Sequence, residues 1–172
     1  MPTIPFPRAR VVLAALALSA AGFVGLIGYE GYTSTAVIPI PGDVPTIGPG
    51  LTRREDGSPV QPGDTITVPK ALALSLREVQ GFEGAIKRCV KVPLHQHEYD
   101  AYVQLSYNIG EGAFCGSTLV RLLNEGRYKE ACAQILRWRH AAGKDCSARG
   151  NRCYGLYIRR QREYTLCLGG SQ

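Results

Sequence analysis

Five carboxylate side chains fall within residues 29–68, a block rich in Gly, Pro and Thr. Cleavage of a glycosidic bond requires one carboxylic acid that protonates the leaving oxygen, and a second group that directs water or stabilises the developing positive charge. Glu30 follows Tyr29, and Asp43 stands in a Gly-Asp turn three residues before Thr46. By position alone, Glu30 is more typical of a surface charge and Asp43 of a turn. The five acids are Glu30, Asp43, Glu55, Asp56 and Asp64.

Other kinds of chemistry find little support in the chain. The sequence His95-Gln96-His97-Glu98 suggests a metal site, but residues two apart on a helix point to different faces, so we expect no bound metal. No glycine-rich phosphate loop of the Walker or dinucleotide type is present, and no cofactor is predicted. We expect the basic last helix not to bind nucleic acid, because the chain carries an export-type N-terminus.

That N-terminus consists of Arg8 and Arg10 followed by an uncharged apolar run over residues 11–28. Eighteen helical residues span about 27 Å, just enough for a bilayer core. The flanking arginines predict a cytoplasmic N-terminus and an exported remainder. We therefore expect residues 1–28 to anchor the chain in a membrane and residues 29–172 to form the functional domain. The alternative is a signal peptide cleaved after Ala21.

The cysteines also indicate an oxidising compartment. All six lie in the second half of the chain, and an even number in a small exported domain indicates disulfides. Six cysteines allow 15 pairings. We predict a local Cys146–Cys153 bridge, and the pairs Cys89–Cys115 and Cys132–Cys167 as one choice among several.

The periodicity of the sequence predicts an α+β architecture. Residues 29–68 read as short strands and turns, because prolines and Gly-Asp turn signals interrupt them. From Pro69 an apolar stripe at helical spacing predicts a long helix that Pro93 ends. Further helices are expected at 95–107, 117–124, 127–140 and 155–168, with a loop over 143–154. The apolar stripe comprises Leu72, Leu76, Val79, Phe82, Ile86 and Val90.

Composition excludes several classes of protein. With 172 residues, 45% hydrophobic and 20% charged, the chain is neither disordered nor a multi-span membrane protein. Its net charge of +6 suits an anionic polymer or surface. We expect a monomer.

Several segments, in order, resemble phage-type lysozymes of glycoside hydrolase family 24. They are GYEG with GDVPTIGPGLT, EYDAYVQLSYNIG (98–110), STLVRLLNEG (117–126), WRHAAGKDC (138–146) and GLYIRRQREYTLC (155–167). The resemblance covers residues 30–168 and implies a lysozyme-like fold, in which a long helix joins a small β-containing lobe to a helical lobe. The weak apolar anchor resembles that of signal-anchor-release endolysins, which leave the membrane after tethering.

The resemblance also implies roles for individual residues. Glu30 matches the general acid and Thr46 the threonine that helps to hold the attacking water. Where the family has an acidic residue or cysteine, six positions before the threonine, this chain has Ile40, so Asp43 is assigned the role of second carboxylate. Tyr107 and Asn108 are expected to contact sugar. Arg159 or Arg160 is expected to support Glu30, although both could equally belong to a solvated basic face.

The implied function is hydrolysis of peptidoglycan between N-acetylmuramic acid and N-acetylglucosamine, leading to host lysis. A lytic transglycosylase and an inactive exported cell-wall-binding protein are the alternatives. We further expect that tethering holds Glu30 at the membrane surface. On release into the periplasm, residues 20–30 would then fold onto the rest of the chain.

Overall fold

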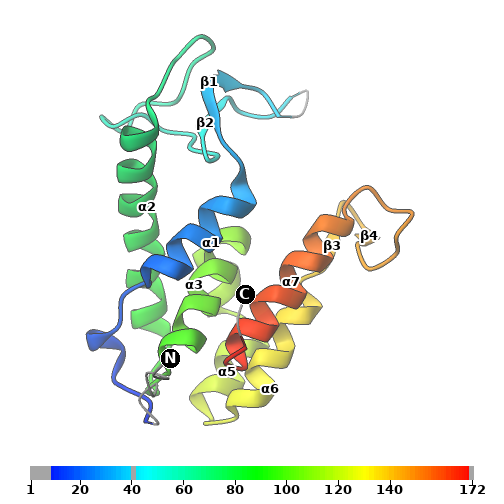
Figure 1. The fold of residues 1–172 in the computed structure, drawn as a ribbon. Helices are drawn as coiled ribbons and strands as arrows, with labels where there is room; N and C mark the ends of the chain where they lie inside the picture. The colour runs from blue at the N-terminus through cyan, green and yellow to red at the C-terminus, as the bar shows by residue number, and fades with distance from the viewer. Residues whose placement is uncertain (1–8, 40–41, 171–172) are drawn as a thin grey trace, which may run out of the picture. The chain divides into compact units, whose positions relative to one another are not determined.

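A computed structural model describes residues 9–39 and 42–170, which fall into two compact units. The small unit is Phe23–Gly81. The large unit comprises the described residues before Phe23 together with those from Phe82 onward. Helix α1 (Ala20–Glu30) and helix α2 (Val68–Cys89) each continue from one unit into the other (Figure 1).

The small unit contains the predicted β-region. Strand β1 (Thr33–Val37) pairs antiparallel with β2 (Thr46–Gly48), with an irregular register between the two ends of the pairing. Isolated bridges extend this region, among them Ile47 to Leu51 and Thr35 to Thr65. Its core consists of Ile47, Leu51 and Val60, with Ala36, Ile66 and Leu74 packed against them.

The long helix predicted from Pro69 is α2, but its apolar stripe is only partly buried. Val79 and Ile86 are fully buried, whereas Leu72 and Leu76 are 38% and 45% exposed. In the first turns the buried positions are instead Ala71 and Ser75. The hydroxyl of Ser75 donates a hydrogen bond of 2.9 Å to the carbonyl of Ala71. The buried face of the helix can therefore hold this serine without leaving its hydroxyl unpaired.

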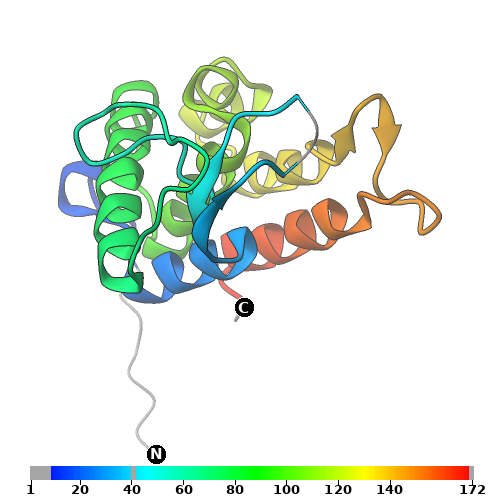
Figure 2. The same ribbon diagram turned by 90° about the horizontal axis from the view of Figure 1, so that it is seen from above.

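The large unit is built mainly of helices. Helix α3 is buried over nine consecutive residues from Glu98 to Ser106, and it packs against α7. Helix α5 packs against α6 (Figures 1 and 2). The helices are α3 (Gln96–Ile109), α4 (Glu111–Cys115), α5 (Thr118–Asn124), α6 (Tyr128–Gln134) and α7 (Tyr154–Cys167), with 3-10 turns η1 (Leu13–Ala15) and η2 (Ile135–Arg137).

Two helix boundaries differ from the sequence-based predictions. The helix expected over 127–140 ends at Gln134 and tightens into η2, so Trp138 lies beyond it. The loop expected over 143–154 contains strand β4 (Lys144–Asp145), which pairs with β3 (His140–Ala141) around a turn at Ala142 and Gly143, both with positive φ. Ser117 caps the start of α5, because its hydroxyl accepts a hydrogen bond from the Val120 amide.

All three predicted disulfides are confirmed. One joins α2 to α4, one joins α6 to α7, and the third closes a short loop before α7. Their six cysteines all belong to the large unit. The pairs are Cys89–Cys115, Cys132–Cys167 and Cys146–Cys153.

The apolar run over residues 11–28 does not form one continuous helix. Val11 pairs with Leu94, η1 follows, and α1 begins only at Ala20, after Ser19 accepts a hydrogen bond from the Gly22 amide. Within residues 9–39 and 42–170, no helix combines the length and apolar character needed to cross a membrane.

Candidate active site

Glu30 is the last residue of α1, and Gly31, with φ of +72°, ends the helix behind it. The Glu30 side chain is half-buried and lies next to the turn that follows β2. A Cβ atom built on Gly50 would lie 3.9 Å from Oε2 of Glu30. Gly50 itself has φ of +89°, a conformation that favours glycine. The helix end and this glycine turn together position the carboxylate.

Asp43 and Thr46 belong to the same small unit as Glu30. Asp43 is exposed, and its carboxylate accepts a hydrogen bond of 2.8 Å from the Val44 amide. Thr46 opens β2, with its hydroxyl 3.5 Å from the carbonyl oxygen of Val37. Ile40, where the family pattern would place an acid, lies outside the described residues.

The two arginines of α7 do not form a solvated face. Arg159 is 8% exposed, and Arg160 and Glu163 are fully buried. Nε of Arg159 donates to Glu163 at 3.0 Å, and Arg160 donates to the other oxygen of that carboxylate. Burial raises the pKa of Glu163 above its usual range, and the two guanidinium groups oppose that shift.

Arg160 also joins α7 to the end of α3. Its Nε donates to the carbonyl oxygen of Trp138 at 2.9 Å, and an Nη donates to the side-chain oxygen of Asn108. The structure therefore brings Asn108 together with Arg160, and the neighbouring Tyr107 ring lies 5.2 Å from the Phe82 ring. Sequence reasoning missed Glu163, although its i+3 and i+4 spacing from the two arginines is a signal of ion pairing on one helix face.

A hollow of about 430 Å³ opens in the small unit, but its lining does not include the candidate catalytic residues. Its floor is formed by core side chains such as Val60 and Leu74, and charged side chains surround it, among them the ion pair of Arg54 with Asp64. The hollow is therefore a feature of the core of the small unit and not the place where Glu30, Asp43 and Thr46 lie.

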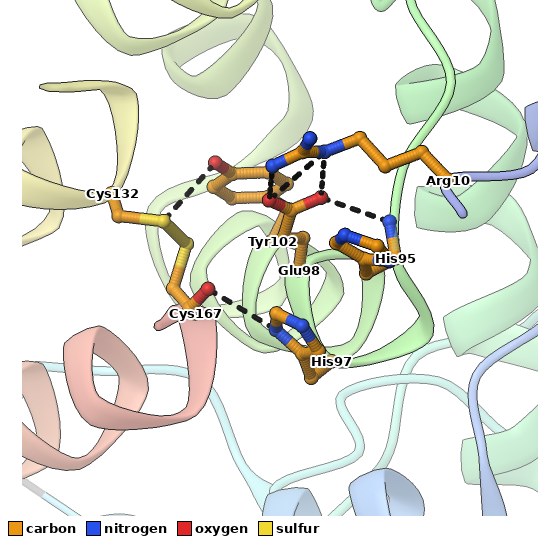
Figure 3. A network of polar contacts seen from close by, with 7 residues as sticks. All are labelled: Arg10, His95, His97, Glu98, Tyr102, Cys132 and Cys167. Atoms are coloured by element: carbon orange, nitrogen blue, oxygen red, sulfur yellow. Dashed lines mark hydrogen bonds and ion pairs between the residues drawn. A yellow bond between two sulfur atoms is a disulfide. The ribbon is translucent and has the colours of Figure 1, made fainter. Parts of the chain in front are cut away.

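The described part of the chain contains no cluster of three His, Cys, Asp or Glu side chains able to hold a metal ion. The rings of His95 and His97 lie parallel, 5.2 Å apart. Nδ1 of His97 is 3.1 Å from the carbonyl oxygen of Cys167, and the His95 amide donates to Glu98 (Figure 3). These contacts connect the start of α3 to neighbouring elements.

The model of the family described as phage lysozyme matches residues 28–163. The chain belongs to the phage lysozyme family. It is 43% identical to the endolysin of Salmonella phage P22 over 125 residues, covering 73% of this chain and 80% of that protein. It is also 32% identical to the SAR-endolysin of Enterobacteria phage P21, covering 92% of this chain and 90% of that protein.

Solved structures of phage lysozymes share the fold. The endolysin from Escherichia coli O157:H7 phage FAHEc1 superimposes with a TM-score of 0.78 at 31% identity, covering 90% of this chain and 94% of that one. A mutant of P22 lysozyme gives a TM-score of 0.75 at 39% identity, covering 89% and 99%. The chain spans only about half of the endolysin of Bacillus phage B103, with which it is 34% identical.

Proposed function

We propose that this phage lysozyme is an endolysin that hydrolyses the bond between N-acetylmuramic acid and N-acetylglucosamine in peptidoglycan. The observation that carries the proposal is the placement of the Glu30 carboxylate, at the end of α1 and beside the Gly50 turn. Family membership and similarity to several phage endolysins support the same substrate.

In this mechanism Glu30 is the general acid. Its proton passes to the glycosidic oxygen as the bond from that oxygen to the anomeric carbon breaks, and positive charge develops on the sugar. A water molecule then forms the new bond to that carbon. Thr46 orients the water, and the exposed carboxylate of Asp43 accepts its proton.

We propose that residues 11–28 first tether the enzyme to the inner membrane and that the enzyme later leaves it for the periplasm. The uncharged apolar run with arginines on its N-terminal side supports this proposal, as does similarity to the P21 SAR-endolysin along most of the chain. The arrangement of residues 10–22 on the large unit then corresponds to the released enzyme.

Substitution of the two carboxylates tests the catalytic assignment. Full-length Glu30→Gln should lose release of soluble muropeptides by at least about 1,000-fold, because the amide has no proton to give. Asp43→Asn should lose about 100-fold if Asp43 accepts the proton of the water. The control is Glu130→Gln, at an exposed ion pair with Arg127. Undiminished release by Glu30→Gln would exclude the assignment.

A further inference from the structure

The carboxylate of Glu98 lies on the buried side of α3 and binds the guanidinium group of Arg10. Only 3% of the Glu98 side chain is exposed. Nη2 of Arg10 lies 2.7 Å from Oε1, and Nε of Arg10 lies 2.9 Å from Oε2, so the two groups meet edge to edge (Figure 3). Such a two-bond pair is the geometry in which a guanidinium binds a carboxylate most specifically.

A second group recognises the face of the same guanidinium. The central carbon of Arg10 lies 3.5 Å from the centre of the Tyr128 ring. The hydrogen bond to Glu98 raises the pKa of Arg10 above its usual value. A carboxylate on the edge and an aromatic ring on the face favour an arginine over a lysine, because a compact ammonium group has no planar fork that can pair with both carboxylate oxygens while lying flat on the ring.

The residues that follow Arg10 are held by the large unit as well. Val11 exchanges two backbone hydrogen bonds with Leu94, at 2.8 and 2.9 Å. Glu83, 8% exposed, accepts a 2.7 Å hydrogen bond from the Leu18 amide. These contacts continue along the segment from the arginine toward α1.

Asp100, on α3, is the third carboxylate that binds this segment, and it does so directly before α1. It is 5% exposed, and it accepts hydrogen bonds from the amide and the hydroxyl of Ser19 at 3.0 and 2.6 Å. Three carboxylates, Glu83, Glu98 and Asp100, are thus buried by one short segment. Without that segment each would lose these donors.

Membrane tethering and this docking exclude each other. In a tethered chain the positive-inside rule places Arg10 on the cytoplasmic side and the residues after the apolar run on the opposite side. A hydrocarbon core of about 30 Å then separates the guanidinium from Glu98. The two groups can meet only after Arg10 has crossed the membrane.

We infer that Glu98 and Tyr128 form a guanidinium-binding site whose ligand is Arg10 of the released chain, and that filling this site keeps residues 10–19 out of the membrane. The inference rests on the proposed tethering and release. To that proposal the inference adds a specific binding site on the large unit. The site stays empty until Arg10 arrives.

Substitutions at Glu98 test the site without changing the anchor. Glu98→Gln keeps an oxygen that accepts the His95 amide hydrogen bond but removes the charge. Glu98→Arg also repels Arg10. Full-length proteins are expressed with Glu30→Gln in every case, so that lysis does not disturb the measurement. The fraction in the soluble periplasmic extract should fall at least fivefold for Glu98→Gln and further for Glu98→Arg.

The reciprocal exchange is the decisive variant. Arg10→Glu combined with Glu98→Arg restores opposite charges, and should recover at least half of the soluble fraction lost by Glu98→Arg. If misfolding explained the loss, the double variant would be no better than the single one, and the inference would fail. The control is Glu111→Arg, at an exposed ion pair with Arg88, which should leave the soluble fraction unchanged.

Two results would overturn the inference in different ways. Normal release of Glu98→Gln would show that Glu98 does not hold the segment. A parent protein that never associates with membranes would overturn the tethering proposal and the inference together. Neither result bears on hydrolysis, which is measured separately on the purified protein with Glu30 intact.

Discussion

At the scale of single residues, Gly50 is a position beside the proposed general acid. Two glycines of the small unit have similar left-handed conformations, with φ of +89° at Gly50 and +83° at Gly57. A Cβ at Gly50 would contact the Glu30 carboxylate, whereas a Cβ at Gly57 would meet nothing within 4 Å. Alanine at either position strains the backbone, but only alanine at Gly50 also contacts Glu30. Comparing the two variants therefore separates backbone strain from an effect on the proposed acid.

We predict that Gly50→Ala and Gly57→Ala each lower the free energy of unfolding by about 1 kcal/mol, because alanine is strained at positive φ. Only Gly50→Ala should also reduce kcat, by about twofold, because its added methyl group contacts the Glu30 carboxylate. Urea unfolding and turnover on isolated peptidoglycan measure the two effects. Equal activity of the two variants would contradict the placement of Glu30 beside Gly50.

Glu163 is the residue on which the buried arginines depend. Replacing it with glutamine removes the negative charge beside Arg159 and Arg160, and breaking a buried ion pair costs about 3–5 kcal/mol. The matched change Glu130→Gln at an exposed pair with Arg127 should leave the free energy of unfolding almost unchanged, because solvent screens an exposed ion pair. Chemical denaturation of both proteins provides the comparison, and similar losses would show that Glu163 is not a structural partner of the arginines.

At the scale of elements, sequence periodicity located helices better than it located their buried faces. The stripe on α2 was right for Val79 and Ile86 and wrong for Leu72 and Leu76, because a buried Ser75 with its own hydrogen-bond partner leaves no hydrophobic signal. The helix predicted over 127–140 would include Trp138, but the chain tightens into η2 before that residue. Helix propensity is a local property, and it does not determine which face of a helix the tertiary structure buries or where the helix ends.

The hydrogen bonds of Asp64, in a turn of the small unit, predict how the stability of the protein depends on pH. The hydrogen bonds from Arg54 lower the pKa of Asp64, and the Gln61 amide adds to this effect. Because the folded-state pKa lies below the unfolded value of about 3.9, the contribution to stability is present above pH 4. It is lost as the pH falls through the folded-state pKa.

Asp64→Asn should therefore lower the urea midpoint at pH 7, and the difference from the wild type should shrink as the pH falls through the folded-state pKa of Asp64. The test is a pair of urea titrations for each protein. A difference that stays constant between pH 7 and pH 2 would mean that the carboxylate charge of Asp64 does not contribute.

At the scale of the whole molecule, the sequence predicted the fold class and the disulfides, but not the location of the N-terminal segment. The apolar run over residues 11–28 carries a membrane signal, and the same residues also form η1 and most of α1. In the described structure, residues 10–19 donate hydrogen bonds to the carboxylates of Glu83, Glu98 and Asp100, and the side chains of Leu13 and Leu16 are buried. These acids come from distant positions on α2 and α3, which no local pattern connects.

The proposed catalytic residues show the same division. The motif resemblance assigns roles to Glu30, Thr46 and Asp43, and all three belong to the small unit. It did not identify Gly50, whose part in the site depends on how a turn meets the end of α1. Nor did it indicate that Asn108 is bonded to Arg160, since 52 residues separate them.

The most direct test is mass spectrometry of the soluble products that the full-length protein, purified under oxidising conditions, releases from isolated peptidoglycan. Hydrolysis by Glu30 with water predicts muropeptides that end in a reducing N-acetylmuramic acid, and their loss in Glu30→Gln. Products that end in anhydro-muramic acid would contradict the hydrolytic mechanism and assign the chain to the lytic transglycosylases. An absence of soluble products from the wild-type protein would contradict the enzymatic function itself.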